Sequence, residues 1–429
     1  MTKIAVYALG LGTSLLITRA VGAAGRGQYY LPVTLVTIAY YLGNMGTQQA
    51  QFRRWAERQG HADHFVTAGV VFAIGLGGLA ALVSWALFSL FGSELLPGVS
   101  ARYVVIVLPL IPILVHSLSV SGLLTLAGRF PHTNNAVLLG AIAQLVGTAA
   151  LFFTGRLTVQ GVLLLYGVGV VLPWLLMLRT VRAVGRFVWP IPWRFVLDQL
   201  KVGAQIEPYV IFMYLNLRID VFFVARYMDL VAVGIYSIAV IFGELIWVVT
   251  DSLAGSVYER QFNAVPDEAV DVTLRAARMN LLLAVIVGLV IGLVAQPAIP
   301  FLFGDELTPA RTVVWALLPA AAAMGVWRPL GVALLRFGAP WLQPFVASVA
   351  LVVNLGANVV LIPRLGIVGA ALASLLSYGV GALLAAAWLV VNRSVSIRQL
   401  LPGRAEVEQL IGFVTDQRAR REFLQLFAR

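Results

Sequence analysis

The sequence contains no cysteine, only four histidines, and charged residues at just 11% of its 429 positions. The missing cysteines exclude disulfides and thiolate metal sites, and four histidines are too few for an imidazole-based site. Soluble domains carry about 25% charged residues, so the low charge excludes an ordinary globular enzyme. The 40 glycines and 19 prolines follow no period, which excludes a collagen-like chain.

The dominant feature of the sequence is long apolar runs, because 60% of its residues are hydrophobic. A spanning helix needs about 20 mostly apolar residues. We therefore predict an all-α polytopic membrane protein with about twelve transmembrane helices. The expected spans are Ile4–Thr18, Gly27–Phe52, Phe65–Ser93, Tyr103–Gly128, Phe130–Gly155, Leu157–Leu178, Val202–Arg226, Leu230–Val257, Met279–Gly304, Thr312–Leu335, Phe337–Pro363 and Leu365–Asn392.

The net charge of +11 would suggest nucleic-acid binding in a soluble protein, but here it is interpreted as the arginine bias of membrane topology. With both termini in the cytoplasm, the predicted inner segments hold 21 Lys and Arg residues and the outer segments hold seven. We expect no nucleic-acid partner. The outer loops are short, which argues against an enzyme acting on extracellular glycans, and no ATP-binding or catalytic motif is present.

Two weak motifs recur at nearly the same distance along the chain. Arg19, Gly27 and Tyr29 recur as Arg226, Gly234 and Tyr236 at an offset of 207. Arg156, Leu157 and Gly161 recur as Arg364, Leu365 and Gly369 at an offset of 208. Two parallel six-helix repeats are then related by a pseudo-two-fold axis along the membrane normal, with the substrate path between them.

The repeats and the charge pattern divide the chain into four predicted parts. Residues 1–182 form an N-terminal lobe, 183–197 a cytoplasmic linker, and 198–392 a C-terminal lobe. Residues 393–429 form a basic tail, in which Val407, Leu410 and Ile411 follow helical spacing and predict an amphipathic helix on the inner leaflet. The alternative for this tail is a solvated segment.

Three motifs resemble those of the Wzx-type polysaccharide and oligosaccharide flippases. This family shares a superfamily with lipid II flippases and with multidrug and toxin extrusion transporters. The motifs are residues 18–22 with 27–29, residues 217–220 with 234–239, and the run Leu361–Ala373. The resemblance covers residues 7–392 and implies a V-shaped, alternating-access transporter, not an enzyme, with no cofactor other than Na⁺ or H⁺ as coupling ion.

The same resemblance implies the substrate, the partners and the location. The substrate is an undecaprenyl-diphosphate-linked oligosaccharide, carried to the outer leaflet of the bacterial cytoplasmic membrane for O-antigen, capsule or exopolysaccharide synthesis. Membrane lipids and the polymerase or glycosyltransferases of the same pathway are the expected partners. A cation-coupled multidrug exporter, working as an antiporter, and a lipid II flippase remain alternatives.

Ionisable residues within predicted spans are the candidates for substrate contact, because charge in hydrocarbon is costly and usually faces a cavity or a partner. Guanidinium groups bind phosphate oxygens in a bidentate fork, so arginines suit a diphosphate headgroup. Arg19 and Glu207 lie near helix ends, and for both the alternative to a substrate role is that the side chain simply reaches the interface. The candidate substrate-binding residues are Arg19, Arg218, Arg328, Glu244 and Asp251. The alternative is a structural ion pair between Arg218 and Glu244.

A candidate cation site combines Asn354 and Asn358, which share a helix face, with Ser374 on the next helix. This spacing resembles the sodium site of the lipid II flippases, which also draws an aspartate from the seventh helix; Asp220 is the candidate here. Asn358 replaces a second aspartate of those relatives. The alternative is a set of interhelical hydrogen bonds that tighten packing.

Overall fold

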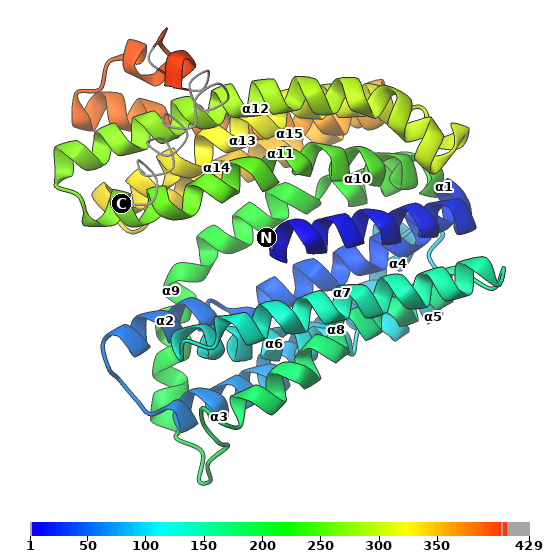
Figure 1. Ribbon diagram of the computed structural model, residues 1–429, viewed down its shortest axis with the longest axis horizontal. Coiled ribbons are helices and arrows are strands. Elements are labelled where there is room, and N and C mark those ends of the chain that lie inside the picture. Colours follow the sequence, from blue (N-terminus) through cyan, green and yellow to red (C-terminus); the bar gives the residue numbers. More distant parts are fainter. Residues whose placement is uncertain (1, 405, 410–429) are drawn as a thin grey trace. The chain divides into compact units, whose positions relative to one another are not determined.

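The computed structural model describes residues 2–404 and 406–409, with the side chains of 249–260 and 262–263 left outside the description. The described chain is helical, with one short π-helix and two 3₁₀ turns, and it contains no β-strand (Figure 1). It divides into two compact units, Met1–Ile235 and Tyr236–Arg429. The boundary falls inside α11, so the predicted linker 183–197 belongs to the first unit.

The first unit is built from ten helices and the start of an eleventh. The helices are α1 Thr2–Asn44, α2 Thr47–Ala56, α3 Ala62–Phe72, α4 Gly78–Leu95, α5 Ala101–Val107, α6 Leu110–Leu126, α7 Phe130–Phe153, α8 Val159–Val181, α9 Trp193–Arg218, α10 Asp220–Tyr227 and, from Leu230, α11. A π-turn at Ala73–Gly77 joins α3 to α4. The closest packing in this unit is of α7 on α8 and of α1 on α7.

Helix α1 consists of two arms that reverse direction at Gly22, whose backbone is non-helical with φ 67° and ψ −175° (Figure 1). Arg26 donates hydrogen bonds from Nη1 to Ser14 Oγ at 2.8 Å and to Thr18 Oγ1 at 2.9 Å. In a straight helix Ser14 and Arg26 would lie about 18 Å apart along the axis, beyond the reach of one side chain. The two arms therefore form a hairpin, which the hydrogen bonds of Arg26 hold together. The Arg26 side chain is only 2% exposed.

The hairpin explains how many times the chain can cross a membrane. Eleven helical stretches of the described residues are long and apolar enough to span a bilayer. The first of them, Thr2–Ala56, has 55 residues, far more than the roughly 20 that one crossing needs. Because α1 reverses at Gly22, this stretch contains the first two predicted spans, which accounts for the difference from twelve.

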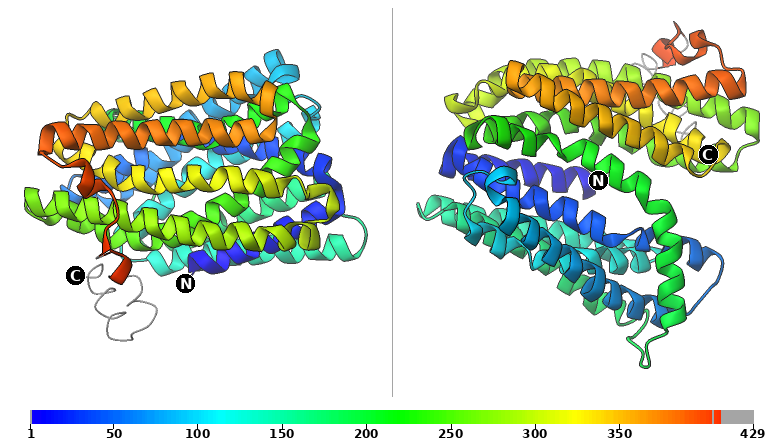
Figure 2. Two further views of the ribbon diagram at one scale, coloured as in Figure 1. Left: turned by 90° about the horizontal axis from the view of Figure 1, so that it is seen from above. Right: turned by 180° about the vertical axis from the view of Figure 1, so that it is seen from behind.

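Helix α9 is longer than the sequence predicted and packs within the first unit, against α2 and α1 (Figure 2). It begins at Trp193 instead of Val202. Gln199 Nε2 donates to the Thr47 carbonyl at 3.0 Å, and the Tyr214 ring stacks on Tyr41 with centroids 3.3 Å apart. These contacts join α9 to α2 and to the second arm of α1.

The second unit contains the rest of α11, to Asn263, and four long helices. These helices are α12 Pro266–Phe303, α13 Ala310–Phe337, α14 Leu342–Leu365 and α15 Ile367–Arg393. Helix α13 packs tightly on α12 and α15, and the fully buried Trp327 lies against Gly381. Arg278 Nε donates to Glu406 Oε1 at 2.6 Å, which ties the segment after α15 to α12. Most of the predicted amphipathic tail, from residue 410 onward, lies outside the described residues.

Large apolar side chains cover the outside of both units. Leu90 and Phe153 are 74% and 80% exposed in the first unit, and Phe301 and Val391 are 77% and 80% exposed in the second. Exposed apolar area on this scale marks contact with a partner or a membrane. Together with the eleven candidate spans, it establishes a multi-pass membrane protein.

Candidate functional site

The two copies of the Arg–Gly–Tyr repeat meet at their glycines, in the first unit. A Cβ on Gly27 would come closer than 3.0 Å to the carbonyl oxygen of Leu230, and a Cβ on Gly234 would do the same to the carbonyl oxygen of Ala23. Residue 230 is residue 23 moved by 207 positions, and residue 234 is residue 27 moved by 207. Each repeat therefore makes the same contact with the other, as a local two-fold axis requires.

This contact is possible only because both repeats carry glycine at the crossing point. Without a Cβ, the backbones of the α1 hairpin and of the α10–α11 turn approach directly. Asp229 Oδ1 accepts the Ala232 N–H at 2.7 Å and caps the start of α11, which fixes the second turn. The ion pair between Arg226 and Glu94, at 3.5 Å, lies beside it on the exposed surface and contributes little.

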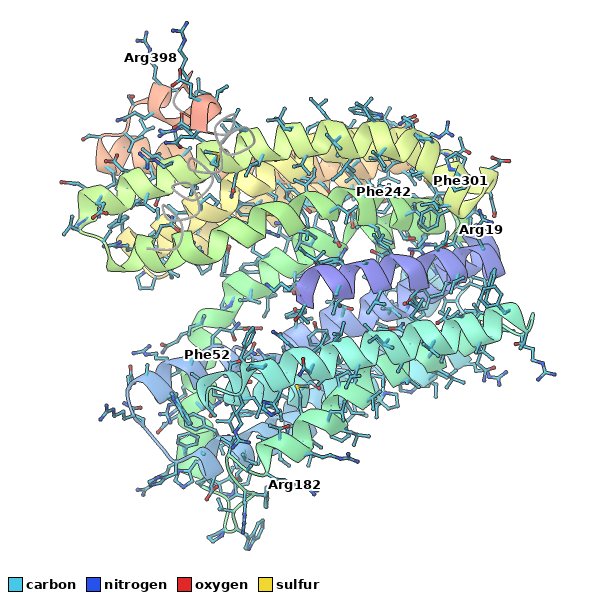
Figure 3. The ribbon with its side chains drawn as sticks, viewed as in Figure 1. Arg19, Phe52, Arg182, Phe242, Phe301 and Arg398 are labelled. Carbon is cyan, nitrogen blue, oxygen red and sulfur yellow. The ribbon has the colours of Figure 1, made fainter. Side chains whose placement is uncertain are left out.

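Arg19 is exposed near the end of the first arm of α1, where Figure 3 labels it. Arg26, seven residues later, makes the hydrogen bonds that hold the hairpin. The sequence alone places Arg26 in the predicted outer loop between the first two spans and indicates no role for it. A signal is present, since Ser14, Thr18 and Gly22 precede Arg26 at intervals of four in a mostly apolar stretch.

Arg218 and Asp220 lie on either side of the junction between α9 and α10. Arg218 ends α9 and is half-buried, whereas Asp220 begins α10 and is only 3% exposed. Asp220 Oδ1 accepts the N–H of Val221 at 2.9 Å. Arg218 belongs to the first unit and Glu244 to the second, so their pairing stays a prediction.

Arg328 lies in the middle of α13 and faces an aromatic ring of the same unit. Its guanidinium carbon is 4.7 Å from the centroid of Trp247, a cation–π contact. Trp247 Nε1 donates to the Ala321 carbonyl at 3.2 Å, which fixes the ring. Glu244, three residues before Trp247, lies on the same side of α11 and is half-buried. Asp251 lies outside the described side chains.

Asn354, Asn358 and Ser374 are buried where α14 packs on α15, with exposures of 0%, 0% and 1%. Asn358 Nδ2 donates to Asn354 Oδ1 at 2.7 Å, so the predicted shared face of the two asparagines is confirmed. Asn354 Nδ2 and Asn358 Oδ1 find no hydrogen-bond partner among the described residues. Unpaired polar atoms in such a place are costly, and an amide oxygen among them can bind a hard cation.

The helix-end position of Glu207 suggested that its side chain reaches the interface, but the structure buries it. Its side chain is 1% exposed, and neither carboxylate oxygen has a side-chain hydrogen-bond partner in the part of the chain that the structure describes. One helical turn earlier, Gly203 lies directly against Gly46 at the start of α2. The extension of α9 and this close packing bury Glu207, and the sequence alone did not indicate either. A buried carboxylate without a partner is a candidate for binding a cation.

A family model described as "Polysaccharide biosynthesis protein" matches residues 1–258. Among solved structures, a lipid II flippase in an inward closed conformation is 15% identical with a TM-score of 0.75, over 97% of this chain and 92% of that one. An inward-facing multidrug resistance transporter is 17% identical with a TM-score of 0.70, over 91% and 94%. A Vibrio cholerae extrusion transporter is 16% identical with a TM-score of 0.66, over 92% and 94%. No curated protein sequence matches.

Proposed function

Because the chain belongs to the polysaccharide biosynthesis protein family and has the fold of known flippases and extrusion transporters, we propose that it exports an undecaprenyl-diphosphate-linked oligosaccharide. The lipid-linked sugar moves from the inner to the outer leaflet of the bacterial cytoplasmic membrane, where it serves O-antigen, capsule or exopolysaccharide synthesis. The protein is a transporter and not an enzyme. The family match carries this proposal, since the structural neighbours fix only the fold.

Arginines in the membrane part suit such a substrate. A diphosphate headgroup has several negative charges, and guanidinium groups hold phosphate oxygens in a bidentate fork. We assign contact with the headgroup to Arg19, Arg218 and Arg328, with Glu244 and Asp251 as further polar groups along the path. Arg328 is already oriented by Trp247 at 4.7 Å, so its guanidinium needs little ordering when the anion arrives.

Deletion of the gene separates this proposal from drug export. Loss of a flippase makes the lipid-linked oligosaccharide accumulate on the inner leaflet. The amount that accumulates is measured by extracting the lipid fraction from cells that lack the gene. Unchanged lipid together with altered drug tolerance would instead support a multidrug exporter working as an antiporter. Accumulation of lipid II would identify a peptidoglycan-precursor flippase. Plasmid-borne copies that restore the normal lipid pool provide the control.

The proposed orientation places both termini and the basic segment 179–201 in the cytoplasm. The protein has no cysteine, so single-cysteine variants can be labelled without background. We expect Arg186→Cys to be labelled by an impermeant maleimide only after the cells are broken, and Arg156→Cys to be labelled in intact cells. Rapid labelling of Arg186→Cys in intact cells would contradict the twelve-helix topology.

Cation coupling is proposed at two buried positions. The first combines Asn354, Asn358 and Ser374 with Asp220. If Na⁺ binds there, removal of sodium at a fixed proton gradient lowers export severalfold, and Asn358→Asp changes the sodium concentration needed for half-maximal export. Transport in vesicles measures both. If export does not depend on sodium in the unmodified protein or in Asn358→Asp, these residues have a packing role only.

The second position is Glu207. A carboxylate buried without a partner is stabilised when a cation, H⁺ or Na⁺, binds to it. We expect Glu207→Gln, which keeps the shape and removes the charge, to uncouple export from the cation gradient and to slow it about tenfold or more, as loss of a buried charged contact does. The control is Glu57→Gln, at an exposed residue that directly follows α2. Wild-type gradient dependence in Glu207→Gln would rule Glu207 out.

A further inference from the structure

A cavity lies within the first unit, and none of the arginines assigned above to headgroup contact lines it. Helices α3, α6 and α8 and the residues that follow α8 line a partly open cavity of about 500 Å³. This volume is in the range of pockets that hold small organic molecules. Its walls are mostly apolar, and they include Phe65, Val70, Leu123 and Phe187.

The rim of this cavity is basic. Arg182 and Arg186 line it, and both side chains are exposed. Figure 3 places Arg182 at the end of α8. Neither guanidinium forms an ion pair with a described carboxylate. The Asp63 carboxylate is nearby, but its Oδ1 accepts the backbone N–H of Arg186 at 2.7 Å and so fixes the rim.

The inner wall carries two buried polar side chains, His116 and Ser119, which are one turn apart on α6 and 8% and 4% exposed. Trp174 Nε1 donates to His116 Nδ1 at 3.0 Å, so the neutral imidazole carries its proton on Nε2. Ser119 Oγ has no hydrogen-bond partner within the described ranges 2–404 and 406–409. A buried hydroxyl without a partner in a cavity wall points to a ligand oxygen as its missing partner.

Exposed aromatic rings follow the two rim arginines along the chain. Phe187 is 49% exposed, and Trp189 and Trp193 are 79% and 55% exposed. Tryptophan next to arginine is typical of the level of the lipid headgroups. A ligand with an anionic head at that level and an apolar chain below it matches the basic rim and the apolar walls.

We propose that this cavity binds one anionic phospholipid of the bilayer. Arg182 and Arg186 hold its phosphate, one acyl chain enters the apolar cavity, and an ester oxygen accepts the hydrogen bond of Ser119. Basic side chains at a membrane surface favour anionic over zwitterionic lipid. The site lies between helices of one unit and is independent of the export path proposed above.

The test uses the full chain purified in nanodiscs that contain equal amounts of phosphatidylglycerol and phosphatidylcholine. Native mass spectrometry after release is expected to show one phosphatidylglycerol retained in preference to phosphatidylcholine. The double variant Arg182→Ala/Arg186→Ala should lose this preference by about tenfold or more, because two basic contacts are removed. Val70→Trp, which fills the cavity and leaves both arginines, should also prevent retention.

The matched control is Arg102→Ala/Arg156→Ala, which removes the same charge from two exposed arginines elsewhere in the first unit. This control should retain phosphatidylglycerol like the unmodified chain. Equal retention of the two lipids, or equal loss in the control pair, would overturn the proposal. Displacement of phosphatidylglycerol by a short prenyl diphosphate, but not by inorganic phosphate, would also overturn it and make the cavity part of the export path.

Discussion

Alanine at Gly27 or at Gly234 is expected to reduce export at least tenfold while the protein remains inserted in the membrane. Each substitution places a methyl group within 3.0 Å of a backbone carbonyl of the other repeat. Backbone cannot move aside like a flexible side chain, and overpacking of this kind costs about 1–3 kcal/mol. We therefore expect the α1 hairpin and the α10–α11 turn to separate.

The effect should depend on this contact and not on losing a glycine from a helix. A Cβ added to Gly10, on the first arm of α1, would meet no described atom within 4 Å, so Gly10→Ala is the matched control and should leave export unchanged. Because the two contacts are related by the repeat, Gly27→Ala and Gly234→Ala should have similar effects. Export is measured as the fraction of lipid-linked oligosaccharide that reaches the outer leaflet.

A second measurement distinguishes separation of the two turns from general damage. A single cysteine at Gln28 reports on the hairpin, since the chain has no other cysteine. Its labelling by an impermeant reagent from outside should become faster in the Gly234→Ala background and stay unchanged with Gly10→Ala. Unchanged labelling together with normal export would show that the repeats do not need this close approach.

The sequence predicted the helical class and the spans, because long apolar runs leave few alternatives to membrane helices. It also predicted the repeat that the glycine contact reveals. It missed Arg26 and the burial of Glu207 for a common physical reason. Both depend on which side chain a distant backbone segment covers: Arg26 is buried by the reversal at Gly22, and Glu207 by the approach of Gly203 to Gly46.

The candidate site could be predicted only in its local parts. The contact between Asn354 and Asn358 follows from a spacing of four on one helix. The contact of Arg328 with Trp247 joins α13 to α11, and no spacing along the sequence indicates it. The cavity beside Arg182 likewise needs three helices and a loop, none of which carries a motif.

Alanine at Arg218 or at Arg328 is expected to lower export at least tenfold, and lysine is expected to restore it only in part. A charged hydrogen bond contributes about 1.5–3 kcal/mol, so the loss of even one bond of a bidentate contact lowers the rate by roughly tenfold to a hundredfold. Lysine keeps the charge but not the fork, and the lysine variant therefore separates attraction from geometry. The rate is measured as the amount of oligosaccharide that reaches the outer leaflet. Membrane fractionation checks that the variants are inserted, and the heat stability of the purified variants checks that they are folded.

Each arginine has a structural alternative that a partner variant can test. If Arg218 serves only to neutralise Glu244, then Arg218→Ala/Glu244→Ala should recover much of the export that either single variant loses. Such recovery would remove Arg218 from the substrate path and leave Arg328 as the main candidate. For Arg328 the partner is Trp247, whose ring lies 4.7 Å from the guanidinium carbon.

Replacing Trp247 with leucine removes the cation–π contact but leaves the charge of Arg328. Such a contact contributes about 0.5–2 kcal/mol, so this variant should lower export less than Arg328→Ala does, and mainly by raising the substrate concentration that half-saturates transport. If the guanidinium only packs on the ring, Arg328→Ala should lower export no more than Trp247→Leu does. Arg328 binds the headgroup if its own loss is the larger of the two.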